Sequence, residues 1–146
     1  MHDFPPIAEL LPHRGSAVLL DAVVEDNADD IRARVRIGPQ HPYFEPGRGV
    51  PVWVGIELMS QAIAAHSGLS SRRSKAPPKK GMLLGTRRFE AATAYFMEGA
   101  ELLVEARREF GGDNEITACV CNISSGGETL ATATIIIVEI PEDKLP

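Results

Sequence analysis

One stretch decides the fold: VWVGIELMSQAIAAHSGL, residues 52–69. Its apolar residues surround a helix axis on nearly all sides, which predicts a helix buried inside a sheet. Glu57 is the one carboxylate in this stretch. A carboxylate among apolar neighbours is costly unless it is hydrogen-bonded or neutralised. Because desolvation raises the pKa of a carboxyl group, such a position suits a general acid working near neutral pH. The alternative is a half-exposed helix residue without a chemical role.

The rest of the chain is predicted to be mainly strands. The clearest is residues 31–37, where apolar residues alternate with Arg32, Arg34 and Arg36. This alternation predicts a half-buried strand whose arginines form a solvated face. Further strands are predicted at residues 17–25, 82–89, 101–110, 115–123 and 129–140. One long helix followed by long antiparallel strands predicts a single α+β domain over residues 1–146, with the sheet wrapped around one central helix.

The connections between these elements are marked by composition. Residues 39–51 carry four prolines and two glycines, which predicts irregular backbone before the helix. Gly68 and the serines after it are expected to end the helix, so residues 70–80 are predicted to be a polar linker. A short helical turn is expected at residues 7–11, tight turns at 27–30, 111–114 and 124–127, and a polar tail at 141–146.

Composition excludes several function classes. The chain has 146 residues, of which 44% are hydrophobic and 24% charged, and its net charge is -5. This acidic balance disfavours non-specific nucleic-acid binding. No basic segment precedes a long apolar run, so we expect neither a signal peptide nor a membrane span. We therefore expect a cytoplasmic location.

Cys119 and Cys121 share one face of a predicted strand and are expected to be reduced and buried. No His or Cys spacing fits a metal site, so no metal or cofactor is expected.

Several short motifs carry a resemblance to a known family. They are LPHR at residues 11–14, VLLD at 18–21, a Glu-x-Met-x-Gln helix at 57–61, Gly-x-x-Arg-Phe at 85–89 and Gly-x-x-Leu at 99–102. Together they resemble the 3-hydroxyacyl-acyl carrier protein dehydratases of the hot-dog fold. The segment 49–59 is similar to a divergent branch of predicted dehydratases associated with aryl-polyene-type lipid pathways.

The resemblance implies an activity and a mechanism. Family members eliminate water from a 3-hydroxyacyl thioester, carried by acyl carrier protein or coenzyme A, to give a trans-2-enoyl thioester. A histidine removes the α proton, the helix carboxylate, here Glu57, protonates the departing hydroxyl, and backbone N–H groups at the helix start polarise the thioester carbonyl. The acyl chain lies between two subunits, which implies a homodimer or a heterodimer with another hot-dog subunit.

The chain departs from the family at the histidine. Counting back from Glu57, the family's histidine position holds Tyr43, which is a second candidate for the base although a tyrosine with an ordinary pKa of about 10 is a poor base near neutral pH. His41 lies in the same loop and is the first candidate for the base, with an exposed loop histidine as the alternative. His13 is expected to make a structural hydrogen bond. His66 lies half a helical turn away from Glu57 and is not expected to act with it.

Other residues are candidates for binding. Gln61 lies one turn after Glu57 and is expected either to orient the carboxylate or the substrate, or to satisfy buried backbone groups. Gly55 and Trp53, at the helix start, are candidates to bind the thioester, although a place in the core or in a tunnel wall is favoured for the Trp53 ring. A basic group is expected to dock the acidic carrier or coenzyme A, unless it is only a solvated loop. Its residues are Arg72, Arg73, Lys79 and Lys80.

Two further functions fit the same residues. A catalytically inactive chain would bind the acyl group and support a second subunit that supplies the histidine. An acyl-CoA thioesterase would use Glu57 to activate water without any histidine, since one fold hosts several activities.

Overall fold

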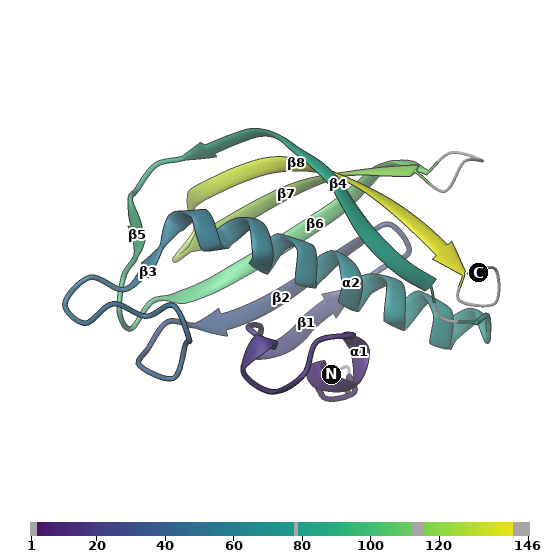
Figure 1. Ribbon diagram of the computed structural model, residues 1–146, viewed down its shortest axis with the longest axis horizontal. Coiled ribbons are helices and arrows are strands. Elements are labelled where there is room, and N and C mark those ends of the chain that lie inside the picture. The colour runs from purple at the N-terminus through teal and green to yellow at the C-terminus, as the bar shows by residue number, and fades with distance from the viewer. Residues whose placement is uncertain (1–2, 78, 112–115, 142–146) are drawn as a thin grey trace.

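The computed structural model describes residues 3–77, 79–111 and 116–141, and one long helix runs through its centre (Figure 1). This helix is α2, Gly55–Ser74, and a single 3-10 turn, η2, Val52–Val54, leads into it. Its buried residues lie at 55, 58, 59, 61, 62, 63, 65, 66 and 69. Burial on so many sides confirms the central helix that the apolar pattern predicts.

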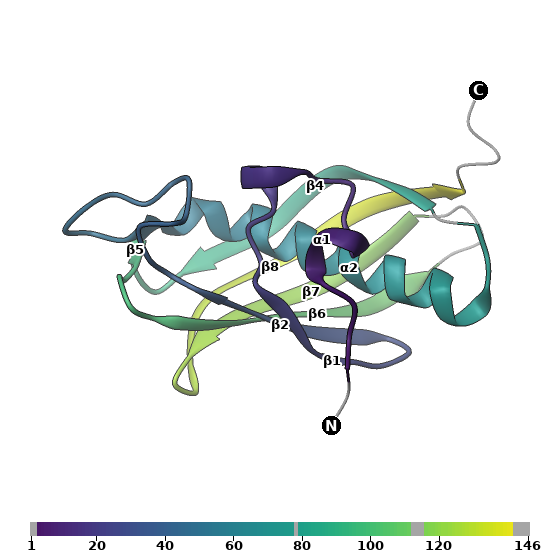
Figure 2. The same cartoon turned by 90° about the horizontal axis from the view of Figure 1, so that it is seen from below.

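A six-stranded antiparallel sheet curves around α2 (Figures 1 and 2). Its strands, in spatial order, are β1 Ala22–Asp26, β2 Asp30–Arg36, β6 Glu101–Gly111, β7 Ile116–Ser125, β8 Glu128–Pro141 and β4 Lys79–Ala91. In β2 the apolar residues point inward and Arg32, Arg34 and Arg36 point outward, as predicted. The α+β prediction of a sheet wrapped around one helix is confirmed.

Small elements cover the side of α2 that the sheet leaves open (Figure 2). They are α1 Ile7–Leu10 and the 3-10 turn η1 Gly15–Ala17, while β3 Val50–Pro51 pairs with β5 Tyr95–Phe96 beside the helix start. The packing of α1 on α2 is close, because a Cβ at Gly68 would lie 2.9 Å from the Leu10 carbonyl oxygen. The N-terminal segment therefore belongs to the core rather than to a loose end.

The helix is longer than predicted, so the linker prediction for residues 70–74 is wrong. α2 continues to Ser74 and ends where Lys75 adopts a left-handed φ of 55°. The last turn is held from outside the helix, because the Arg73 guanidinium pairs with the buried Asp26 carboxylate of β1. His66 also donates from Nδ1 to Asp26, at 2.7 Å. His66 is thus occupied away from Glu57, as the helical spacing predicts.

Two strand predictions need adjustment. The strand predicted at 17–25 begins only at Ala22, because η1 and an extended segment precede it. β4 covers 79–91 rather than 82–89, and it contains two bulges. Residues 112–115 and 142–146, which include most of one predicted turn and of the predicted tail, lie outside the described residues.

The two cysteines are free and buried in β7, as predicted. Burial raises the pKa of the Cys119 thiol to about 11 and also raises that of Cys121. Both thiols are therefore protonated and unreactive near neutral pH.

The sheet has one long open edge, β4. Met82, Leu83 and Leu84 on this strand are each more than half exposed. Three successive exposed apolar side chains on an edge strand mark a surface that suits pairing with another chain.

Candidate active site

Glu57 stands on the outward side of the first turn of α2. Its side chain is 47% exposed, and Glu57 is more exposed than any other residue from 55 to 71. The expectation of a buried carboxylate is therefore wrong for the single chain. The apolar neighbours of Glu57 in the sequence point toward the sheet, whereas Glu57 points away from it.

His13, from the N-terminal segment, contacts Glu57. The His13 ring donates from Nε2 to Glu57 Oε1 at 3.1 Å, because a carboxylate can only accept. Arg14 Nη1 holds the turn that carries this histidine by donating to the carbonyl oxygens of Leu11, Pro12 and His13, at 3.2, 3.3 and 2.9 Å. The sequence predicts a structural hydrogen bond for His13, but its partner lies 44 positions away and no local pattern identifies it.

Gln61 connects the same segment to Glu57 from inside the protein. Its side chain is fully buried. Its Oε1 accepts from the N–H groups of Leu19 and Leu20, at 2.9 and 3.4 Å. Its Nε2 donates to Ala17 O at 2.7 Å and to Glu57 Oε1 at 3.2 Å. Both suggested roles of Gln61 thus coexist: it satisfies buried backbone groups and orients the carboxylate. Glu57 Oε1 receives two donors, and no described residue bonds Oε2.

His41 makes no hydrogen bond to Glu57, although its position in the loop before the helix makes it the first candidate for the base. It is only 5% exposed, and its Nδ1 accepts from the Tyr43 N–H at 3.2 Å. The proton of the neutral ring therefore sits on Nε2, which meets no partner among the described residues. This environment suits a hydrogen-bond donor and not a general base, and the alternative of an exposed loop histidine is wrong as well.

Burial lowers the pKa of His41 below its ordinary value of 6.5, and the Asp21 carboxylate opposes this shift. The unfolded chain then binds the proton more readily, so the free energy of unfolding falls as the pH drops below about 6.5 and levels off below the folded pKa. We expect His41→Gln to remove this part of the pH dependence. Urea unfolding of both proteins between about pH 7.5 and about pH 5 measures it. An unchanged slope in the variant would contradict this assignment.

The comparisons identify the family. A family model described as "ApeP-like: ApeP dehydratase" matches residues 5–145. The chain belongs to the ApeP-like family. The resemblance to a divergent branch of hot-dog dehydratases and the dehydratase function are thereby confirmed. A comparison with curated proteins found no significant match.

Solved structures agree with this ApeP-like assignment. A chain of the dehydratase heterocomplex ApeI:P from Xenorhabdus doucetiae has 25% sequence identity and a TM-score of 0.88, with 97% of this chain and 95% of that chain covered. A hypothetical thioesterase from Streptococcus pneumoniae, solved with coenzyme A, has 10% identity and a TM-score of 0.65, covering 82% and 84%. A thioesterase from Pseudomonas aeruginosa has 12% identity and a TM-score of 0.63, covering 82% and 80%. The two thioesterases share only the hot-dog fold with the ApeP-like chain.

The aromatic candidates lie at the surface of this ApeP-like chain. Tyr43 and Trp53 are both exposed, and their rings meet edge to face with centroids 5.6 Å apart. Trp53 lies one turn before Glu57, so its ring is a surface group and not part of the core of the single chain. A role of Tyr43 in proton transfer and of Trp53 in binding stays a prediction.

Gly55 has a different role from the predicted one. Its N–H already donates to the Val52 carbonyl, so this group is not free to polarise a thioester. A Cβ at this position would lie 3.1 Å from the Ile123 side chain and 3.3 Å from the Phe96 ring. Gly55 therefore allows the start of α2 to pack closely against β5 and β7.

The predicted basic group is divided by the structure. Arg72 is exposed on the last turn of α2, whereas the Arg73 guanidinium is engaged by Asp26 and Ser70. Lys79 and Lys80 begin β4, and their side chains lie outside the description. Arg72 follows Glu57 by 15 positions, roughly 22 Å of helix rise.

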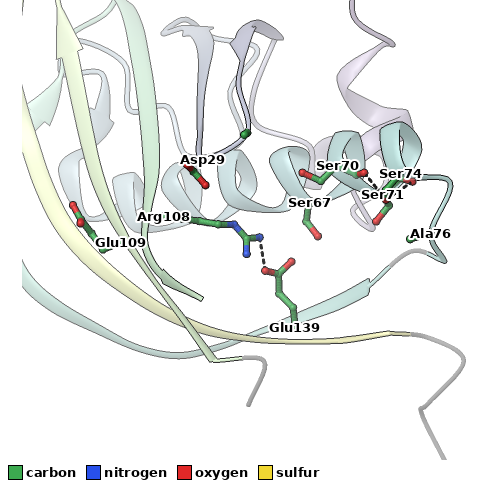
Figure 3. A pocket seen from close by; sticks show the side chains of 10 residues that line it. Asp29, Ser67, Ser70, Ser71, Ser74, Ala76, Arg108, Glu109 and Glu139 are labelled. Atoms are coloured by element: carbon green, nitrogen blue, oxygen red, sulfur yellow. Dashed lines mark hydrogen bonds and ion pairs between the residues drawn. The ribbon is translucent and has the colours of Figure 1, made fainter. Parts of the chain in front are cut away.

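The same end of α2 borders a polar cavity of about 570 Å³ (Figure 3). Ser67, Ser70, Ser71 and Ser74 line one wall of it, and the Arg108–Glu139 ion pair, with its N–O distance of 2.5 Å, lines another. It lies at the opposite end of the helix from Glu57 and is separate from the candidate active site.

Among residues 3–77, 79–111 and 116–141, no cluster of His, Cys, Asp and Glu is placed to hold a metal ion. No helix within the described ranges combines the length and apolarity needed to cross a bilayer.

Proposed function

We propose that this chain is one subunit of a two-subunit hot-dog dehydratase that acts on a 3-hydroxyacyl thioester of acyl carrier protein. The observation that carries the proposal is the setting of Glu57. Its carboxylate is exposed, its Oε1 is fixed by His13 and Gln61, and its Oε2 has no partner among the described residues. A carboxyl group held in one orientation with one oxygen open suits proton transfer to a substrate that approaches from outside the chain.

The reaction needs a second group that this chain does not place at the site. Elimination breaks the α C–H bond and the β C–O bond, so a base takes the α proton while an acid protonates the departing hydroxyl to release water. Within the described part of the chain, His13 Nε2 faces Glu57, His66 binds Asp26, and His41 Nδ1 accepts from backbone. We therefore assign the acid to Glu57, whose neutral form would carry its proton on Oε2, and the base to the partner subunit.

The open edge supports a partner of the same fold. β4 exposes Met82, Leu83 and Leu84 beside unpaired backbone groups, and another edge strand would bury both. The similar structure from Xenorhabdus doucetiae is a heterocomplex, which favours a different subunit over a second copy of this chain. A thioesterase activity rests only on fold and is the weaker candidate.

Mass spectrometry of the carrier-bound acyl group tests the proposal. The 3-hydroxyacyl-carrier protein is incubated with this chain alone, with a hot-dog dehydratase subunit from the same source alone, and with the co-purified pair. We expect loss of water only with the pair. Rapid water loss with this chain alone would overturn the two-subunit assignment, and release of free acid would indicate a thioesterase.

A further inference from the structure

We propose that His13 is a positioning residue that holds Glu57 for the reaction, an inference that rests on the proposed function. The Nδ1 atom of His13 is buried and meets no partner among the described residues. Its Nε2 is directed at Glu57 Oε1, 3.1 Å away. The imidazole therefore acts on the substrate through the carboxylate.

The contacts around Glu57 define what His13 does. The hydrogen bond from His13 needs only that Oε1 accepts, so it forms whether the carboxyl group is ionised or carries its proton on Oε2. Gln61 donates to the same oxygen from the next turn of α2, so two donors from different directions fix Oε1. With Oε1 fixed, rotation of the carboxyl group is restricted and Oε2 keeps one direction toward an incoming substrate.

The segment that carries His13 is itself held in place. Arg14 closes the turn on one side of His13 through three backbone carbonyl groups. On the other side, Gln61 binds Ala17 and Leu19 of the same segment. Gln61 thus fixes both Glu57 and the chain that delivers His13, so one buried amide sets the distance between the two groups.

A pair of substitutions separates positioning from proton transfer. Glutamine can place its Nε2 amide near the imidazole Nε2, whereas leucine fills a similar volume without a donor. For the active pair of subunits, we expect His13→Leu to lower kcat by about 10- to 100-fold with little change in KM, and His13→Gln to stay within about 3-fold of wild type. Equal losses in both variants at unchanged melting temperature would overturn positioning and indicate that the imidazole itself carries a proton. Full activity of His13→Leu would show that His13 is not needed.

A second measurement does not depend on activity. Long-range ¹⁵N NMR of the histidine rings reports which nitrogen carries the proton. We expect His13 to be protonated at Nε2 in the wild-type chain and to lose this preference in Glu57→Leu, while the His66 signals, set by Asp26, stay unchanged. If the protonated nitrogen of the His13 ring were the same in Glu57→Leu as in the wild-type chain, the contact would be refuted. If the wild-type pair lacks dehydratase activity, the proposed function fails, yet this spectrum still decides the His13–Glu57 interaction.

Discussion

Glu57→Gln is expected to reduce the dehydratase activity of the proposed two-subunit enzyme by about 100- to 10,000-fold, the range typical for loss of a general acid. The amide is nearly isosteric with the carboxyl group, and its oxygen can still accept from His13 and Gln61. What it cannot do is deliver a proton to the departing hydroxyl. Mass spectrometry of the carrier-bound product gives the rate.

The fold is expected to survive this substitution, because Glu57 is half exposed and lies outside the core. Glu109→Gln is the matched control, since Glu109 is an exposed carboxylate on β6 that pairs with Arg107 at 2.6 Å. It should leave the rate unchanged. A Glu57→Gln chain that unfolds or fails to bind its partner would show that the carboxylate is structural, and a normal rate would remove Glu57 from the mechanism.

Gln61→Leu is expected to cost about 2–4 kcal/mol of the free energy of unfolding, because it leaves two buried backbone N–H groups without a partner at about 1–3 kcal/mol each, partly offset by relaxation. These groups are the N–H of Leu19 and the N–H of Leu20, whereas the carbonyl of the exposed Ala17, which also loses its donor, can bond to water. Leucine has nearly the volume of glutamine, so the loss reflects hydrogen bonding and not a cavity. Urea unfolding monitored by circular dichroism measures the change.

Gln40→Leu provides the comparison for that experiment. The Gln40 amide also donates to backbone, at 2.9 Å to Arg36 O, but on the surface, where water can replace it. We expect a change below about 0.5 kcal/mol there. If Gln61→Leu were equally mild, water would have to reach the interior beside α2, and Gln61 would not be the link between the N-terminal segment and the helix.

The parts of the fold that follow from local periodicity could be predicted. The apolar pattern of α2 and the alternation of Ile31, Ala33 and Val35 each depend on neighbours within a few residues. The end of α2 could not be placed in this way. Its last turn is polar and resembles a linker, and it is stabilised by a pairing between Arg73 and Asp26 that spans 47 positions.

The candidate site could likewise be predicted only where it depends on residues close together in the sequence. Glu57 and Gln61 stand out because a carboxylate and an amide interrupt an apolar helix one turn apart. The contact of Glu57 with His13 depends on how the N-terminal segment crosses α2, and only the three-dimensional structure shows it. The environment of His41 could not be predicted either. The proline-rich loop folds so that His41 is buried and accepts from Tyr43 N–H, which does not suit the role of base that its position suggests.

The open edge of β4 affects how much of this chain a cell can make without loss to aggregation. A 13-residue strand with unpaired backbone groups and three exposed apolar side chains is a template for any other unpaired strand. Synthesised in excess, the chain would pair with copies of itself or with unfinished proteins and be lost to aggregation or proteolysis. For the proposed pair of subunits, we therefore expect the yield of this chain to follow the dosage of the partner's gene, and overexpression of this chain alone to burden the host.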